Sequence, residues 1–106
     1  MEQTFAQIKD AVANWVYGIK DKLHYAVTDI VLDTPGSLRI IFENKEYIAE
    51  LLVEQGCFDP YRFVKLEILP LTSSYPVPVY LWYDSQNDDI NSIIRNLQIR
   101  LNWFKQ

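Results

Sequence analysis

The stretch that decides the fold of this chain is LRIIFENKEYIAELLVE, residues Leu38–Glu54. Its first part, LRIIFE, is rich in β-branched and aromatic residues, which favour a strand. The polar pair Asn44-Lys45 follows and suits a tight reversal of the chain. A two-residue turn at this pair predicts that Phe42 lies opposite Tyr47, which is a favourable cross-strand contact. The stretch therefore predicts a β-hairpin.

The second half of the stretch has two interpretations. The apolar residues of EYIAELLVE also match the spacing of a helix that begins after Asn44 and ends before Gly56. Two β-compatible runs around a short polar turn favour a strand over residues 45–55. The like charges of Glu43 and Glu46 beside the turn count against the hairpin. We expect the strand, and the helix stays open as the alternative.

A helix and a strand are predicted before this hairpin. Apolar residues recur at three- and four-residue steps over residues 3–22, which indicates an amphipathic helix. Thr4 and Gln7 have the spacing of a capping box at its start. From Tyr25 the period changes to two, which predicts a strand. The following TPGS suits a type II turn in which Gly36 has a positive φ.

Two strands and a second helix are predicted after the hairpin. Tyr61–Leu69 alternates as a strand, and SSYPVPVYLWYDS, Ser73–Ser85, contains another. The two prolines of SSYPVPVYLWYDS remove N–H groups from one side of the strand, which is typical of an edge strand. Ser85 is the expected N-cap of the closing helix. The buried stripe of that helix comprises Ile90, Ile93, Ile94, Leu97, Leu101 and Phe104.

The elements predict one α+β domain over residues 1–106. Their order is α-β-β-β-β-β-α, and short connections between strands favour an antiparallel meander with the N- and C-terminal helices on one face. A length of 106 residues suits one domain. A content of 49% hydrophobic and 23% charged residues is typical of a globular protein.

Charge and cysteine content limit the expected partners and compartment. The formal net charge is −4, and the acid excess argues against binding nucleic acid, whose phosphates require a positive surface. The single cysteine, Cys57, allows neither an internal disulfide nor a cysteine-based zinc site. MEQTFAQIKD has no apolar signal region, and no apolar run approaches the roughly 20 residues of a membrane span. We expect a cytoplasmic protein that binds no membrane and fits a basic protein partner.

The sequence carries no pattern that indicates catalysis, a cofactor or a metal. His24 is the only histidine, and Cys57 belongs to a different loop, so a Cys–His pair has little support. Asp84, Asp88 and Asp89 lack the spacing of a calcium loop and are expected to cap a helix. None of the glycines belongs to a phosphate-binding pattern. The chain is therefore predicted to be non-enzymatic.

The face of the sheet that the helices leave uncovered is the predicted interaction surface. Val77, Val79, Leu81 and Tyr83 are expected to face the core, so that their neighbours on the last strand point outward. Aromatic, apolar and charged residues together resemble an interface more than a plain polar surface. The face is expected to include Asp29, Arg39, Ile41, Leu52 and Lys65. The predicted partner-binding residues are Glu43, Glu50, Glu54, Phe63, Glu67, Tyr80 and Trp82. The alternatives are a solvated acidic face, a sheet that curls, and a loop that covers the face.

A second apolar patch is predicted on the closing helix. Ile99 and Trp103 lie four residues apart and off the main apolar stripe. They form either the seam of a homodimer or a contact with the first helix, and both interpretations stay open.

The layout of the chain resembles that of small bacterial immunity proteins, the antidotes encoded beside polymorphic or contact-dependent toxins. The similarity lies in a short amphipathic helix, a meander with the ENKEY reversal into IAELLVEQG, and the closing helix DDINSIIRNLQIRLNWF. It covers most of the chain in layout and transfers no individual residue. The resemblance implies a cytoplasmic, non-enzymatic protein that masks a cognate toxin. Many such toxins are basic nucleases, which an acidic face suits.

Two other functions are compatible with the sequence. The helices and the sheet could enclose an aromatic-lined pocket for a small molecule. The chain could also be a structural homodimer. We expect a protein-binding module and keep these two as alternatives.

Overall fold

A computed structural model of the chain describes all residues except 1–3, 23–26, 56–62, 72–76, 86 and 104–106. Its elements are α1 (Phe5–Ile19), the 3-10 turn η1 (Lys20–Lys22), β1 (Val27–Thr34), β2 (Ser37–Glu43), β3 (Tyr47–Glu54), β4 (Val64–Pro70), β5 (Tyr80–Tyr83) and α2 (Ile90–Trp103). This order confirms the predicted α-β-β-β-β-β-α arrangement. The stretch over residues 45–55 is a strand, so the helical alternative is wrong.

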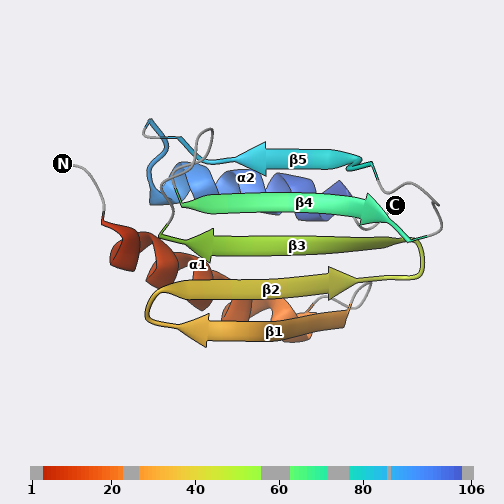
Figure 1. The fold of residues 1–106 in the computed structure, drawn as a ribbon, viewed down its shortest axis with the longest axis horizontal. Coiled ribbons are helices and arrows are strands. Elements are labelled where there is room, and N and C mark those ends of the chain that lie inside the picture. The colour runs from red at the N-terminus through yellow and green to blue at the C-terminus, as the bar shows by residue number, and fades with distance from the viewer. Residues whose placement is uncertain (1–3, 23–26, 56–62, 72–76, 86, 104–106) are drawn as a thin grey trace.

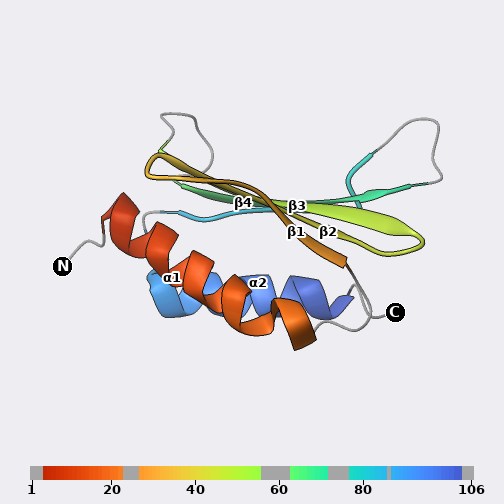
Figure 2. The ribbon, with the colours of Figure 1, turned by 90° about the horizontal axis from the view of Figure 1, so that it is seen from below.

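The five strands form one antiparallel meander in the order β1-β2-β3-β4-β5 (Figure 1). Both helices lie on the same side of the sheet (Figure 2). The chain is thus a single compact α+β domain of two layers. Its radius of gyration of 13.4 Å is close to the about 13 Å expected for a compact domain of this size.

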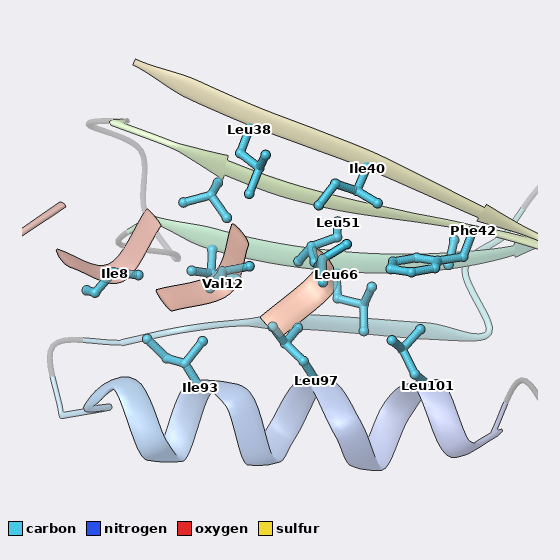
Figure 3. Close-up of a cluster of buried hydrophobic side chains, with 14 of the residues drawn as sticks. Ile8, Val12, Leu38, Ile40, Phe42, Leu51, Leu66, Ile93, Leu97 and Leu101 are labelled. Carbon is cyan, nitrogen blue, oxygen red and sulfur yellow. The ribbon is translucent and has the colours of Figure 1, made fainter. Parts of the chain in front are cut away.

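The core lies between the sheet and the two helices (Figure 3). Strand residues alternate, so every second side chain of β2, β3 and β4 is buried against the helices. Apolar residues of both helices complete the core because they recur at helical spacing. The buried apolar residues are Phe5, Ile8, Val12, Val16, Leu38, Ile40, Phe42, Ala49, Leu51, Val53, Val64, Leu66, Ile68, Ile93, Leu97 and Leu101.

The turn of the β2–β3 hairpin is centred one residue later than predicted, at Lys45-Glu46, because Asn44 N donates to Tyr47 O at 3.0 Å. Phe42 lies opposite Ala49, not Tyr47. The side chain of Asn44 explains the difference, because its Oδ1 accepts hydrogen bonds from the backbone N–H groups of Glu46 (2.9 Å) and Tyr47 (2.8 Å). Such an Asx turn holds Asn44 opposite Tyr47 and moves the reversal one residue along the chain. The small Ala49 leaves the Phe42 ring free to pack toward the helices.

The start of α1 confirms the predicted capping box. Thr4 Oγ1 accepts from Gln7 N at 3.2 Å, and Gln7 Oε1 accepts from Thr4 N at 2.9 Å. The predicted type II turn after β1 is wrong, because the φ of Gly36 lies outside the left-handed region. Proline suits the second position of both type I and type II turns, so the TPGS sequence does not distinguish them.

The closing helix begins later than predicted, and Asp89 caps it in place of Ser85. Asp89 Oδ1 accepts from Ser92 N at 2.8 Å, the geometry of an N-cap. Ser85 instead takes part in a preceding turn, in which its backbone N–H and its hydroxyl both donate to Asp88 Oδ2. Asp88 also accepts from the Ser92 hydroxyl through its other oxygen. Asp89 therefore caps the helix as predicted, but Asp88 and Asp89 precede its first turn. Asp84, which was also expected to cap a helix, instead accepts from the N–H groups of Phe63 and Val64.

Candidate functional site

The uncovered face of the sheet, called the open face below, is the surface opposite the two helices (Figure 2). Directly paired residues of neighbouring strands share a face, so the strand registers define it. The open face comprises Val27, Asp29, Leu32, Thr34, Ser37, Arg39, Ile41, Glu43, Ile48, Glu50, Leu52, Glu54, Lys65, Glu67, Leu69, Leu81 and Tyr83.

The four predicted partner-binding glutamates all lie on the open face. Glu43 is on β2, Glu50 and Glu54 are on β3, and Glu67 is on β4. With Asp29, the open face carries five carboxylates against the two cations Arg39 and Lys65, which gives a net charge of −3 among the described residues. Their position is as expected, and their role in binding stays a prediction.

Glu50 is the one glutamate of this set that an ion-pair network already neutralises. Its Oε2 lies 2.7 Å from Arg39 Nε, and its Oε1 lies 3.8 Å from Lys65 Nζ. The two cations stand on either side of Leu52, one strand away in each direction. Glu50 is therefore held in place by its neighbours and is the least available of the glutamates for a partner.

Glu67, in contrast to Glu50, has no neighbouring cation that pairs with it among the described residues. It pairs directly across the β3–β4 ladder with Glu50, and like charges in that position destabilise a sheet. Among the described residues, Glu43, Glu54 and Glu67 form no ion pair. These unpaired carboxylates leave negative potential on the open face that a basic partner could neutralise.

Apolar side chains lie between these charges. Ile41, Ile48, Leu52 and Leu69 are only half-buried, and Leu81 is 46% exposed. Ile48, Leu69 and Leu81 were not predicted to be members of this face. The alternation of β3 and β4 could have identified Ile48 and Leu69, whereas Leu81 depends on the register of β5.

Tyr80 and Trp82, which were predicted to bind a partner from the open face, lie on the helix side of the sheet. Tyr80 pairs with Ile68 and Trp82 with Leu66, and both partners are buried against the helices. Trp82 packs against the core cluster. Leu81, which was expected inside, is on the open face instead. The outward assignment of Tyr80 and Trp82 is therefore corrected.

A contact with α2 explains the inward position of Trp82. The guanidinium carbon of Arg100 lies 5.7 Å from the centre of the indole ring, which is within the range of a cation–π interaction. Arg100 is positioned by its own helix, since its Nη1 donates to Asn96 Oδ1 at 3.0 Å.

Phe63 is also corrected, because it packs on the helix side. Its ring lies 5.3 Å from that of Phe5 in an edge-on arrangement, and it contacts the core cluster. Phe63 N and Val64 N both donate to Asp84 Oδ1, each at 2.9 Å. Two successive N–H groups directed at one carboxylate break the alternation of an extended strand, which the sequence pattern assumed.

The predicted patch on α2 is described only in part. Ile99 is 57% exposed on the outer surface of the helix. Trp103 is the last residue of α2, and its side chain lies outside the described part. The homodimer seam stays a prediction.

His24 and Cys57 both fall outside the described residues. A surface or capping role for His24 and a buried apolar role for Cys57, the ordinary roles of these residue types, stay predictions. In the part of the chain that the structure does describe, no group of three or more His, Cys, Asp or Glu side chains could hold a metal ion. Over the same residues, neither helix combines the length and the apolarity needed to cross a lipid bilayer.

Comparison with protein-family models, with curated proteins and with solved structures finds no significant match to this chain.

Proposed function

We propose that this chain is a non-catalytic protein-binding module and that the open face is its working surface. The observation that supports this proposal is the one-sided fold: both helices cover the same side of the sheet. The other side mixes half-buried apolar residues with charges of both signs. That mixture is typical of interfaces that form and dissociate, whereas a sheet face that only meets water is more uniformly polar.

The charge of the open face suggests a partner with a basic surface. Its described residues carry a net charge of −3. Glu43, Glu54 and Glu67 form no ion pair with any other described residue. Complementary potentials accelerate association and disfavour acidic competitors. The apolar residues between the acids, chiefly Leu52 and Ile41, would supply the desolvated centre that most stable interfaces contain.

The specific form of this proposal is a cytoplasmic immunity protein that neutralises a toxin by covering its active surface. It rests on the resemblance in layout, and the acidic open face adds a physical reason, since a toxin that cuts nucleic acid needs a basic surface. Occlusion of that surface requires no catalytic group on this chain. The small-molecule site and the structural homodimer stay predictions that no described feature favours.

Site-specific cross-linking tests the open face as the binding site. A photoreactive amino acid is placed at Glu67 on the open face or, as the matched control, at Gln98 on the exposed side of α2. We expect Glu67 to capture one discrete protein from the native cell and Gln98 to capture none. Equal capture from both positions, or capture from Gln98 alone, would contradict the proposal.

Co-expression then tests the immunity function. The captured protein should arrest growth when it is expressed alone and should be harmless when this chain is co-expressed. If the captured protein has no effect on growth, the proposal of a protein-binding module stands and the proposal of an immunity protein is contradicted.

A further inference from the structure

The two edges of the sheet differ in how well they are protected. β5 has four residues, Tyr80–Tyr83, and follows Pro78 closely. β1 has eight residues, Val27–Thr34, and contains neither proline nor lysine. Natural sheets discourage pairing with other chains by short strands, proline, lysine and β-bulges. The bulge of β1 affects only its second half, and neither proline nor lysine protects its first half, whereas β5 closely follows Pro78. β1 therefore has the less protected edge.

The pairing surface of β1 is its first half. Val27–Ile30 pairs regularly with β2, and the register then shifts between Ile30 and Leu32. Such a bulge bends the strand and interrupts regular pairing, so an added strand would align with Val27–Ile30, called the β1 edge below. Val27 is 72% exposed and Leu32 is 41% exposed. Both lie on the open face and would gain apolar contacts from an added strand.

Charge distinguishes a foreign strand from a second copy of this chain. Asp29 lies in the middle of the β1 edge, is exposed, and forms no ion pair with another described residue. Asp33, the other acid of β1, is held at 2.8 Å by Lys9 of α1. Because β1 contains no cation, a second copy of β1 would bring nothing to neutralise Asp29. A foreign strand that carries lysine or arginine would neutralise Asp29.

We propose that the β1 edge binds an extended segment of the partner protein that carries a cationic side chain beside Asp29 and apolar side chains on either side of it. Backbone hydrogen bonds along the edge would provide affinity, and alternate side chains would provide selectivity. Asp29 is in the same cross-strand row as Ile41, Glu50 and Glu67. The added strand would thus extend the open face. This inference rests on the proposed function and specifies how the partner attaches.

Peptide binding to the whole chain tests this attachment. The probe is a short synthetic peptide that alternates threonine with valine and has one lysine at its centre; the matched peptide has glutamate in place of lysine. Amide hydrogen exchange is measured residue by residue. We expect the lysine peptide to slow the exchange of backbone amide hydrogens within the β1 edge. The glutamate peptide should bind with an affinity at least about tenfold lower.

Two charge reversals complete the test. Asp29→Lys should weaken binding of the lysine peptide by about tenfold, whereas Asp10→Lys, the same change on the exposed side of α1, should leave binding unchanged. Unchanged exchange at the β1 edge, slowed exchange along β5 instead, or an Asp29→Lys variant that binds as well as the parent would overturn the inference. So would a dimer, seen by light scattering without peptide, whose β1 edge is already protected.

The outcome is separate from that of the proposed function. If cross-linking from Glu67 captures a partner but the peptide does not bind at the β1 edge, only the proposed strand addition at the β1 edge is overturned. If the peptide binds at the β1 edge and Glu67 captures nothing, the open face fails as the working surface.

Discussion

At the scale of single residues, Asp84 links the start of β4 to the end of β5 through both its side chain and its backbone. Its side chain is buried, with 1% of the residue exposed. Its Oδ1 accepts from two backbone N–H groups at the start of β4, and its own N–H donates to Val64 O at 3.0 Å. Asp84 thus closes the β4–β5 ladder and fixes the bend that turns Phe63 toward Phe5.

We expect Asp84→Ala to lower the free energy of unfolding by about 3 kcal/mol. The substitution leaves two backbone N–H groups without their acceptor, and each such loss costs about 1–3 kcal/mol. Urea unfolding followed by tryptophan fluorescence measures the change. Asp10→Ala, on the exposed side of α1, is the control and should change stability by less than about 0.5 kcal/mol. A similar small effect for both variants would refute this role of Asp84.

Gly18 offers a stabilising substitution. It lies within α1, and a Cβ added to it meets no atom within 4 Å. Gly18→Ala should therefore raise the free energy of unfolding by about 1 kcal/mol, because alanine loses less backbone entropy in a helix. Thermal unfolding by circular dichroism provides the measurement. Asn14→Ala, on the exposed side of the same helix, should give a smaller gain; a loss of stability at Gly18 would indicate a contact that the structure does not show.

At the scale of elements, β5 is held by its inward aromatics. Trp82 packs on the core and under the Arg100 guanidinium of α2. Trp82→Ala should lower the free energy of unfolding by about 3 kcal/mol, as loss of a large packed ring commonly does. Leu81→Ala, the neighbouring change on the open face, should cost less than about 1 kcal/mol.

The same pair of variants separates folding from binding. Under conditions in which both variants are folded, Leu81→Ala should lower the affinity for the partner protein, and Trp82→Ala should leave that affinity unchanged. Chemical unfolding and a binding titration at low temperature give the two quantities. If folded Trp82→Ala loses binding while Leu81→Ala retains it, Trp82 belongs to the interface after all.

The elements were predictable wherever periodicity extends over many residues. The two helices and the buried residues of β2 and β4 follow from spacing. The spacing of β3 also fitted a helix, and the short polar turn before it favoured the strand. The faces of Tyr80 and Trp82 did not, because β5 is short and its face depends on which residue of β4 it meets. The Asn44 and Asp84 side chains shifted a turn and a strand start through hydrogen bonds, and such contacts leave no periodic signal. The positions of the four glutamates on the open face were therefore predictable, whereas the three predicted aromatics, Phe63, Tyr80 and Trp82, lie on the helix side.

At the scale of the whole molecule, the open face combines a stability cost with a proposed function. Glu67 faces Glu50 across β3 and β4, so an opposite charge at that position would improve the sheet. Glu67→Lys should raise the free energy of unfolding by about 0.5 kcal/mol. A residue that weakens the fold and strengthens binding is common at functional sites. Unfolding in urea measures this change, and a clear loss of stability would contradict the described register.

The central claim is that the open face binds a basic protein partner, and one affinity comparison tests it most directly. The dissociation constant of the partner captured through Glu67 is measured for the parent chain, for Glu67→Lys, and for Asp10→Lys, the same charge change on the helix side. We predict that Glu67→Lys weakens binding about tenfold or more, because it places a cation against a basic surface, and that Asp10→Lys binds like the parent. Equal affinity for all three proteins, or a loss confined to Asp10→Lys, would contradict the claim.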